Sequence, residues 1–128
     1  MGNISIISNN PQVLAQYPQH TNVIAGGVYD VYQAARNLIH QGAVLINHPL
    51  SGSIKPNQSP YRSLVVSTDG NGVVDFDSLS LIEGAFITLR KLPELNRTYT
   101  EQVLDDFQVI DLDLLDAAIQ ALPAKYYF

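Results

Sequence analysis

The chain has 128 residues, the length of one domain (1–128), and no cysteine, which excludes disulfides, thiolate metal sites and cysteine catalysis. Its net charge of −5 argues against general nucleic-acid binding, which relies on clustered lysine and arginine. Only 15% of the residues are charged, which leaves little polar surface for a monomer and favours self-association, for example as a homodimer.

The N-terminal segment contains no recognisable targeting signal. It lacks the basic start and long apolar run of a signal peptide, and Ile6 stands where myristoylation needs serine or threonine. No apolar run of the chain approaches the roughly 20 residues of a membrane span. We therefore expect a cytoplasmic protein with no membrane partner.

The first part of the chain alternates predicted strands and helices. A strand over residues 3–8 precedes a short helix that begins at Pro11, with Asn10 as its N-cap. A second strand over 22–25 is followed by Gly26-Gly27 and by a helix over 28–41. The side chains expected to face the core from these two helices are Val13, Leu14, Tyr17, Val28, Tyr29, Val31, Tyr32, Ala35, Leu38 and Ile39.

The remainder of the chain is richer in helices. Residues 43–47 and 62–68 are predicted strands, and their relative orientation stays open because no helix connects them. Asp111 is predicted as the N-cap of the last helix. The predicted helices of this part cover 77–92, 100–108 and 112–122. Together the elements favour an α/β fold, a single layered domain with a small, mainly parallel sheet of about four strands flanked by helices.

The 48–62 loop, which joins the third and fourth predicted strands, is the stretch most indicative of function. It runs from His48 to Arg62 without periodicity, and such long loops in compact domains tend to be functional or disordered. Its three prolines restrict the backbone and favour order. In a parallel sheet the loop would leave the carboxyl end of a strand, where open α/β sheets bind ligands. Asn9-Asn10 and Gly26-Gly27 are expected at the same edge.

The chemistry of this loop favours recognition of a small anion. No carboxylate occurs from residue 31 to residue 68, and residues 1–68 carry a net charge of +2, from three basic residues against Asp30. Backbone amides and hydroxyls at 51–53, with two nearby cations, would support a millimolar-to-micromolar ligand. The competing interpretation is a structural loop or a protein contact surface. The predicted ligand-binding residues are His48, Ser51, Gly52, Ser53, Lys55, Asn57, Tyr61, Arg62, Asn9 and Asn10.

The sequence resembles the GrdX family. The resemblance is carried by the run HPLSGSIKPNQSPYRS in the loop, by ISNNP near the start and by VLDDFQVIDL near the end, and it covers nearly the whole chain. It implies a small accessory protein encoded alongside the selenium-dependent glycine, sarcosine and betaine reductases of anaerobic amino-acid-fermenting bacteria. A protein of the reductase complex is therefore an expected partner. The resemblance implies a setting rather than a reaction.

The shared loop positions and the departures from the family pattern can be stated by residue. Gln58-Ser59 and Arg62 differ from the family's usual residues, although Arg62 keeps the positive charge. The segment 69–75 is atypical for the family, so no role is transferred to it. The positions that match the family pattern are His48, Pro49, Ser51, Gly52, Ser53, Lys55, Pro56, Pro60 and Tyr61.

Two other functions compete with ligand binding. A hydrolase-like enzyme could use His48 as a general base with Ser51 or Ser53 as the nucleophile, but the nearest acids in the sequence are Asp30 and Asp69. We therefore leave open whether the protein is an enzyme. The second competitor is a purely structural interaction protein in which the loop forms a homodimer contact.

The sequence offers no pattern that points to a cofactor or a metal. Residues 69–77 look like the latter part of a calcium-binding EF-hand loop, but Ser67 and Ser78 stand at its first and last ligand positions. Asp75 or Asp77 is expected instead to cap the next helix.

The remaining polar residues have ordinary explanations. His20 and His40 lack metal-ligand spacing and are expected at the surface. The tail from 99 to 128 carries a net charge of −5, from six acids against Lys125. Its acidic residues are expected to be solvated, with docking of a partner as the alternative: Asp105, Asp106, Asp111, Asp113 and Asp116.

Overall fold

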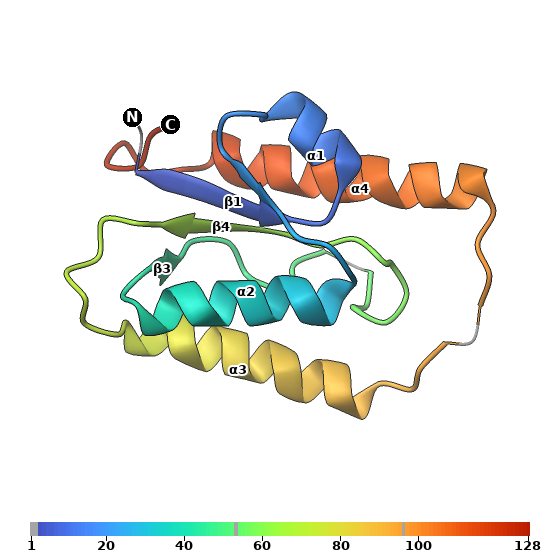
Figure 1. Ribbon diagram of the computed structural model, residues 1–128, viewed down its shortest axis with the longest axis horizontal. Coiled ribbons are helices and arrows are strands. Elements are labelled where there is room, and N and C mark those ends of the chain that lie inside the picture. The colour runs from blue at the N-terminus through green and yellow to red at the C-terminus, as the bar shows by residue number, and fades with distance from the viewer. Residues whose placement is uncertain (1–2, 53, 96) are drawn as a thin grey trace.

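The protein forms three layers, with a sheet between two pairs of helices. The computed structural model describes residues 3–52, 54–95 and 97–128. The helices α1 (Pro11–Gln16) and α4 (Glu101–Gln120) cover one face of the sheet, and α2 (Val28–His40) and α3 (Phe76–Lys91) cover the other (Figure 1). None of the helices in these described ranges combines the length and apolar character needed to cross a membrane.

The sheet is mixed, so the predicted α/β class is confirmed but the mainly parallel arrangement is wrong. Its strands are β1 (Ile4–Ser8), β2 (Thr21–Val23), β3 (Val44–Leu45) and β4 (Ser63–Ser67), in the order β2-β1-β4-β3. β1 and β2 are parallel, whereas β4 is antiparallel to both of its neighbours. The reversal follows from the connection between β3 and β4, which contains no crossover helix.

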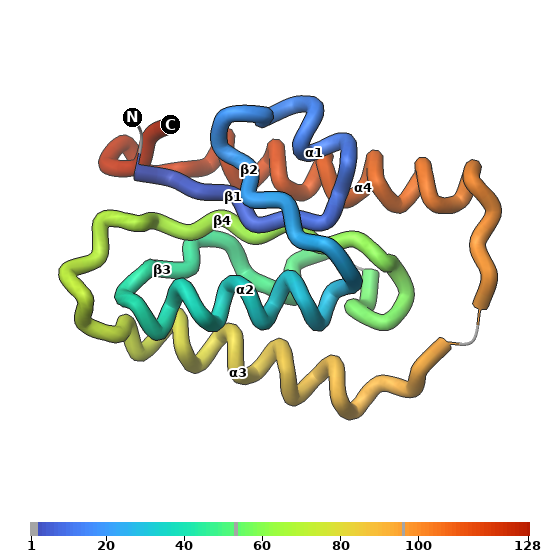
Figure 2. Tube along the Cα trace, in the orientation of Figure 1, coloured from blue at the N-terminus to red at the C-terminus, as the bar shows by residue number. Residues whose placement is uncertain are grey.

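Although β4 is reversed, the other three strands still end at one edge of the sheet, as the sequence predicted for the strands before the loop. β1, β2 and β3 all run in one direction, so their carboxyl ends meet the amino end of β4 at a single edge. The 48–62 loop leaves β3 there and re-enters the sheet through β4 (Figure 2). The loop therefore lies at the carboxyl edge of three strands.

The core is divided by the sheet into two apolar clusters. Alternate residues of β4 face opposite sides, so that Leu64 and Val66 pack toward α2 and α3 while Val65 packs toward α1 and α4. The buried residues of α2 recur at three- and four-residue spacing, as predicted. They are Val28, Val31, Tyr32, Ala35 and Ile39.

Several local predictions are confirmed and two core assignments are wrong. Asn10 caps α1 by accepting a hydrogen bond from Gln12 N, and Asp75 caps α3 by accepting one from Ser78 N. Leu14 is 38% exposed and Tyr29 is 52% exposed, although both were expected in the core. Both side chains are only partly covered by neighbouring elements, as the edge contact of Tyr29 with Phe86 of α3 shows.

The acidic tail forms one continuous helix instead of the two predicted helices. α4 extends from Glu101 to Gln120, with Thr100 as its N-cap, and no glycine or proline interrupts it. Asp111 is therefore an interior residue of α4, and only 8% of its surface is exposed. The expectations that Asp111 caps a helix and is solvated are both wrong, because its carboxylate is bonded to groups of the sheet edge.

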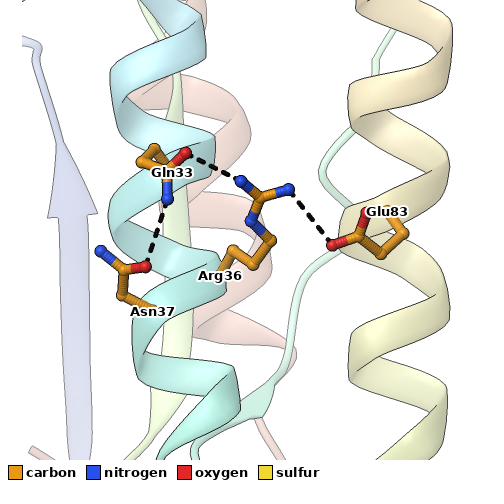
Figure 3. Close-up of polar contacts among 4 residues, drawn as sticks. All are labelled: Gln33, Arg36, Asn37 and Glu83. Atoms are coloured by element: carbon orange, nitrogen blue, oxygen red, sulfur yellow. Dashed lines mark hydrogen bonds and ion pairs between the residues drawn. The ribbon is translucent and has the colours of Figure 1, made fainter.

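A polar cluster on the outer surface fixes α2 against α3. Arg36 forms an ion pair with Glu83 at 3.4 Å and donates a second hydrogen bond to Gln33, which itself donates to Asn37 (Figure 3). The Arg36 guanidinium also lies 4.2 Å from the centre of the Phe86 ring. Arg36 is one of the few cations between residues 31 and 68. Because these contacts use its guanidinium, it is not free to bind a ligand.

Candidate functional site

The loop edge of the sheet is cross-linked through Asn9, which directly follows β1. Its Nδ2 donates to the backbone oxygen of Gly26 at 3.0 Å and to that of Pro60 at 2.7 Å. Its Oδ1 accepts from the backbone N–H of Arg62 at 2.9 Å. One side chain thus joins the ends of β1 and β2 to the 48–62 loop, and the predicted convergence of these segments is confirmed.

A chain of hydrogen bonds closes the α4 side of this edge. Asn10 N donates to Ser8 Oγ at 3.0 Å, the Ser8 and Ser63 hydroxyls lie 2.7 Å apart, and Ser63 Oγ donates to Asp111 Oδ2 at 2.6 Å. Because the single Ser63 proton is given to Asp111, the Ser8 hydroxyl must donate to Ser63. The Asn10 amide adds a second bond to Asp111 Oδ2 at 3.0 Å and donates to Gln108 O. These buried polar groups satisfy one another.

The buried Asp111 carboxyl titrates under opposing influences. Burial raises its pKa from the usual 3.8, whereas the bonds from Ser63 and Asn10 and the charge of Arg62 act to lower it. Burial dominates, so the pKa of Asp111 is raised overall. The nearby Tyr32 hydroxyl behaves similarly, since burial raises its pKa and the Arg62 charge opposes the rise.

Arg62 is the most unusual residue of the site because its charge is buried. Only 6% of its surface is exposed, and its Nε and Nη2 have no hydrogen-bond partner among the described residues. It lines a narrow hollow of about 10 Å³, which is room for about one water molecule or one oxygen atom of an anion. Asp111 and Ser59 line the same hollow. Buried guanidinium N–H groups without partners are costly and call for an acceptor.

A much larger cleft opens on the other side of the loop. It has a volume of about 480 Å³ and lies between the start of α2, residues 56–60 of the loop, and the end of α3 with the segment that follows it. Its size falls in the range of small-molecule sites. We call it the α2–α3 cleft. Its lining includes Tyr29, Tyr99, Pro56, Asn57, Arg90 and Glu94.

The structure distributes the predicted loop residues over different places. Arg62 lines the narrow hollow, whereas Lys55 is exposed and lines a third depression of about 220 Å³ with Leu50 and Thr88. The two cations therefore do not share one pocket. Gly52 has a φ of +89° and packs so closely against Leu114 of α4 that a Cβ there would approach its side chain to 2.8 Å.

Two of the other predicted residues, Tyr61 and Asn57, tie the loop to neighbouring segments. The Tyr61 hydroxyl accepts a hydrogen bond from Gln108 at 2.8 Å, which ties the loop to α4. Asn57 Nδ2 donates to Pro93 O at 2.9 Å and ties the loop to the segment after α3. Ser51 is exposed at the surface of the loop. Ser53 lies outside the described residues.

The geometry at His48 does not assemble a catalytic dyad. His48 Nδ1 accepts the backbone N–H of Leu50 at 3.0 Å, and Ser51 N donates to the His48 backbone oxygen. Among the described residues, His48 makes no hydrogen bond to a hydroxyl or to a carboxylate. A general base needs both the substrate hydroxyl and an orienting partner within reach. No observation therefore favours the hydrolase alternative.

Sequence reasoning missed the contribution of α4 to the site. Asp111 lies four residues from Phe107 and four from Leu115, so it falls on the inward stripe of one long helix. That spacing was available in the sequence, but a helix break placed at Asp111 concealed it. The two tyrosines of the cleft were also missed as site residues: Tyr29 was assigned to the core, and nothing in the sequence around Tyr99 indicates a binding surface.

Comparison with known proteins identifies a family over most of the chain. The family model described as "GrdX-like protein" matches residues 5–120, which include the 48–62 loop, β4 and all of α4. The comparisons with curated proteins and with solved structures gave no match.

Proposed function

The chain belongs to the GrdX-like protein family, and we propose that it is an accessory protein of selenium-dependent glycine and betaine reductase metabolism that binds a small anion through the 48–62 loop. The metabolic setting rests on the resemblance to the GrdX family. The anion rests on one observation of this chain, the buried Arg62 guanidinium with Nε and Nη2 unpartnered among the described residues.

The geometry around Arg62 restricts the kind of anion. The hollow admits about one oxygen atom, so the ligand inserts one oxygen of a carboxylate or another oxyanion and keeps the rest of its body at the mouth. A charge-assisted bond to guanidinium suits such an oxygen. Asp111 is not within ion-pair distance of Arg62, since the ion pair found among the described residues is that of Arg36 and Glu83. The carboxylate of a partner protein could occupy the same place.

Thermal unfolding in the presence of acetate, phosphate and selenite tests the proposal. At ionic strength matched with sodium chloride, one of these anions should raise the melting temperature by about 5 °C at tenfold its Kd. Arg62→Gln should abolish that response, whereas Lys55→Ala, which alters a separate depression, should retain it. If no anion stabilises the wild type, or if Arg62→Gln responds as the wild type does, the anion site is wrong.

The metabolic setting needs a separate experiment. A tagged copy of the chain, purified from its native host, should carry subunits of the reductase complex with it. Arg62→Gln in the tagged protein would show whether a partner's carboxylate occupies the hollow, because that variant should lose the partner. Recovery of the chain without any reductase subunit would contradict the proposed setting but not the binding of a free anion.

A further inference from the structure

The α2–α3 cleft has aromatic walls that are held in place before any ligand binds. The ring of Tyr29 is 52% exposed and packs edge-on against Phe86, with ring centres 5.5 Å apart. Tyr99 packs in the same manner against Phe107 at 5.3 Å, and its hydroxyl donates to Gln58 O at 2.6 Å. Both rings line the cleft in orientations fixed by these contacts, which reduces the entropy lost when a flat molecule binds against them.

One of the residues that line the cleft carries an acceptor without a donor among the described residues. Asn57 uses Nδ2 to bind Pro93 O, which fixes the orientation of its carboxamide. Its Oδ1 is buried and has no hydrogen-bond partner among the described residues. A buried carbonyl-type oxygen usually has a donor, so this atom invites an N–H group brought by a ligand.

The charges of the cleft favour an uncharged occupant. Arg90 and Glu94 both line it and have opposite signs. The start of α2 offers little to an anion, because the Asp30 carboxylate accepts the Gly27 N–H at 2.9 Å and places a negative charge in the first turn. Among the described residues, Ser59 alone lines both this cleft and the Arg62 hollow, and the cleft does not include Arg62 itself.

We propose that the α2–α3 cleft binds an uncharged, flat aromatic amide or heteroaromatic molecule, stacked at Tyr29 and Tyr99 and donating an N–H to Asn57 Oδ1. The volume of about 480 Å³ accommodates a bicyclic ring system with substituents. The inference goes beyond the proposed anion binding and does not depend on Arg62.

Titration with benzamide, followed by the NMR signals of the tyrosine rings, tests this inference. Benzamide carries one ring and one amide and should bind with a millimolar Kd. Benzoate, which has the same ring but a charge and no N–H, should bind the cleft at least tenfold more weakly. Cyclohexanecarboxamide, which keeps the amide but is not flat, should also be weaker.

Variants separate the cleft from nonspecific binding. Tyr29→Ala and Asn57→Ala should each weaken benzamide at least fivefold, whereas Asn57→Asp keeps an acceptor oxygen and should lose less. Tyr127→Ala, which removes another exposed tyrosine, should bind as the wild type does. Arg62→Gln should also retain benzamide binding, which distinguishes this test from that of the anion site. Absence of benzamide binding, or unchanged binding in a folded Tyr29→Ala protein, would overturn the inference.

Discussion

The two sides of the 48–62 loop differ in how their polar groups are satisfied. On the α4 side, Ser8, Asn10, Ser63 and Asp111 form a closed network, and the remaining space holds about one water molecule. On the other side, the loop borders a cleft of about 480 Å³ with the half-exposed Tyr29 ring and with Asn57 Oδ1, which has no partner among the described residues. The α4 side therefore anchors the loop and, among the described residues, leaves the Arg62 guanidinium as its unsatisfied group, whereas the other side presents an open cleft.

Removing the carboxylate at the centre of the closed network should have the largest effect on stability. Asp111→Ala leaves Ser63 Oγ and Asn10 Nδ2 each with one partner fewer inside the buried network. We expect a loss of about 3 kcal/mol in the free energy of unfolding. Urea denaturation measures it, with exposed Asp113→Ala as the control on the same helix. A loss below about 1 kcal/mol would show that the network does not anchor the loop.

Removing the Asn9 side chain, which joins the ends of β1 and β2 to the loop, should have the second largest effect on stability. Asn9→Ala removes two bonds that Asn9 donates, to Gly26 O and Pro60 O, and the acceptor of the Arg62 N–H. We expect a loss of about 2 kcal/mol, together with faster hydrogen exchange at the Arg62 amide. Asn37→Ala, at an exposed helix position, is the matched control and should cost about 0.5 kcal/mol or less. Unchanged exchange at Arg62 would mean that the loop is held without Asn9.

The pH dependence of stability tests whether burial or hydrogen bonding dominates at the Asp111 carboxyl on the α4 side. Because the pKa of Asp111 is raised in the folded protein, the folded state holds this proton more tightly than the unfolded state does. The stability of the wild type relative to Asp111→Asn should therefore be greatest below pH 3.8 and fall as the pH rises through the raised pKa. Unfolding of both proteins across this range checks the sign. A relative stability that rises with pH would show that hydrogen bonds outweigh burial.

The loop was found from sequence, but its chemistry was only partly predictable. Its length and prolines singled it out, and Asn9 and Gly26 do meet it at the carboxyl edge. Lys55 and Arg62 were expected to act together, yet they line different hollows. Whether a loop side chain turns inward depends on the space left by α4 and α2, and local sequence does not encode that space.

The sequence by itself determined the family, the α/β class and the local ends of several elements. The caps at Asn10 and Asp75 and the spacing of α2 are set by contacts within a few residues, so they can be deduced without a fold. Only the tertiary structure decided the direction of β4, the burial of Asp111 in a continuous α4 and the exposure of Tyr29. Each of these depends on groups far apart in the chain, as the bond between Asn10 and Asp111 shows, and so on how the layers pack.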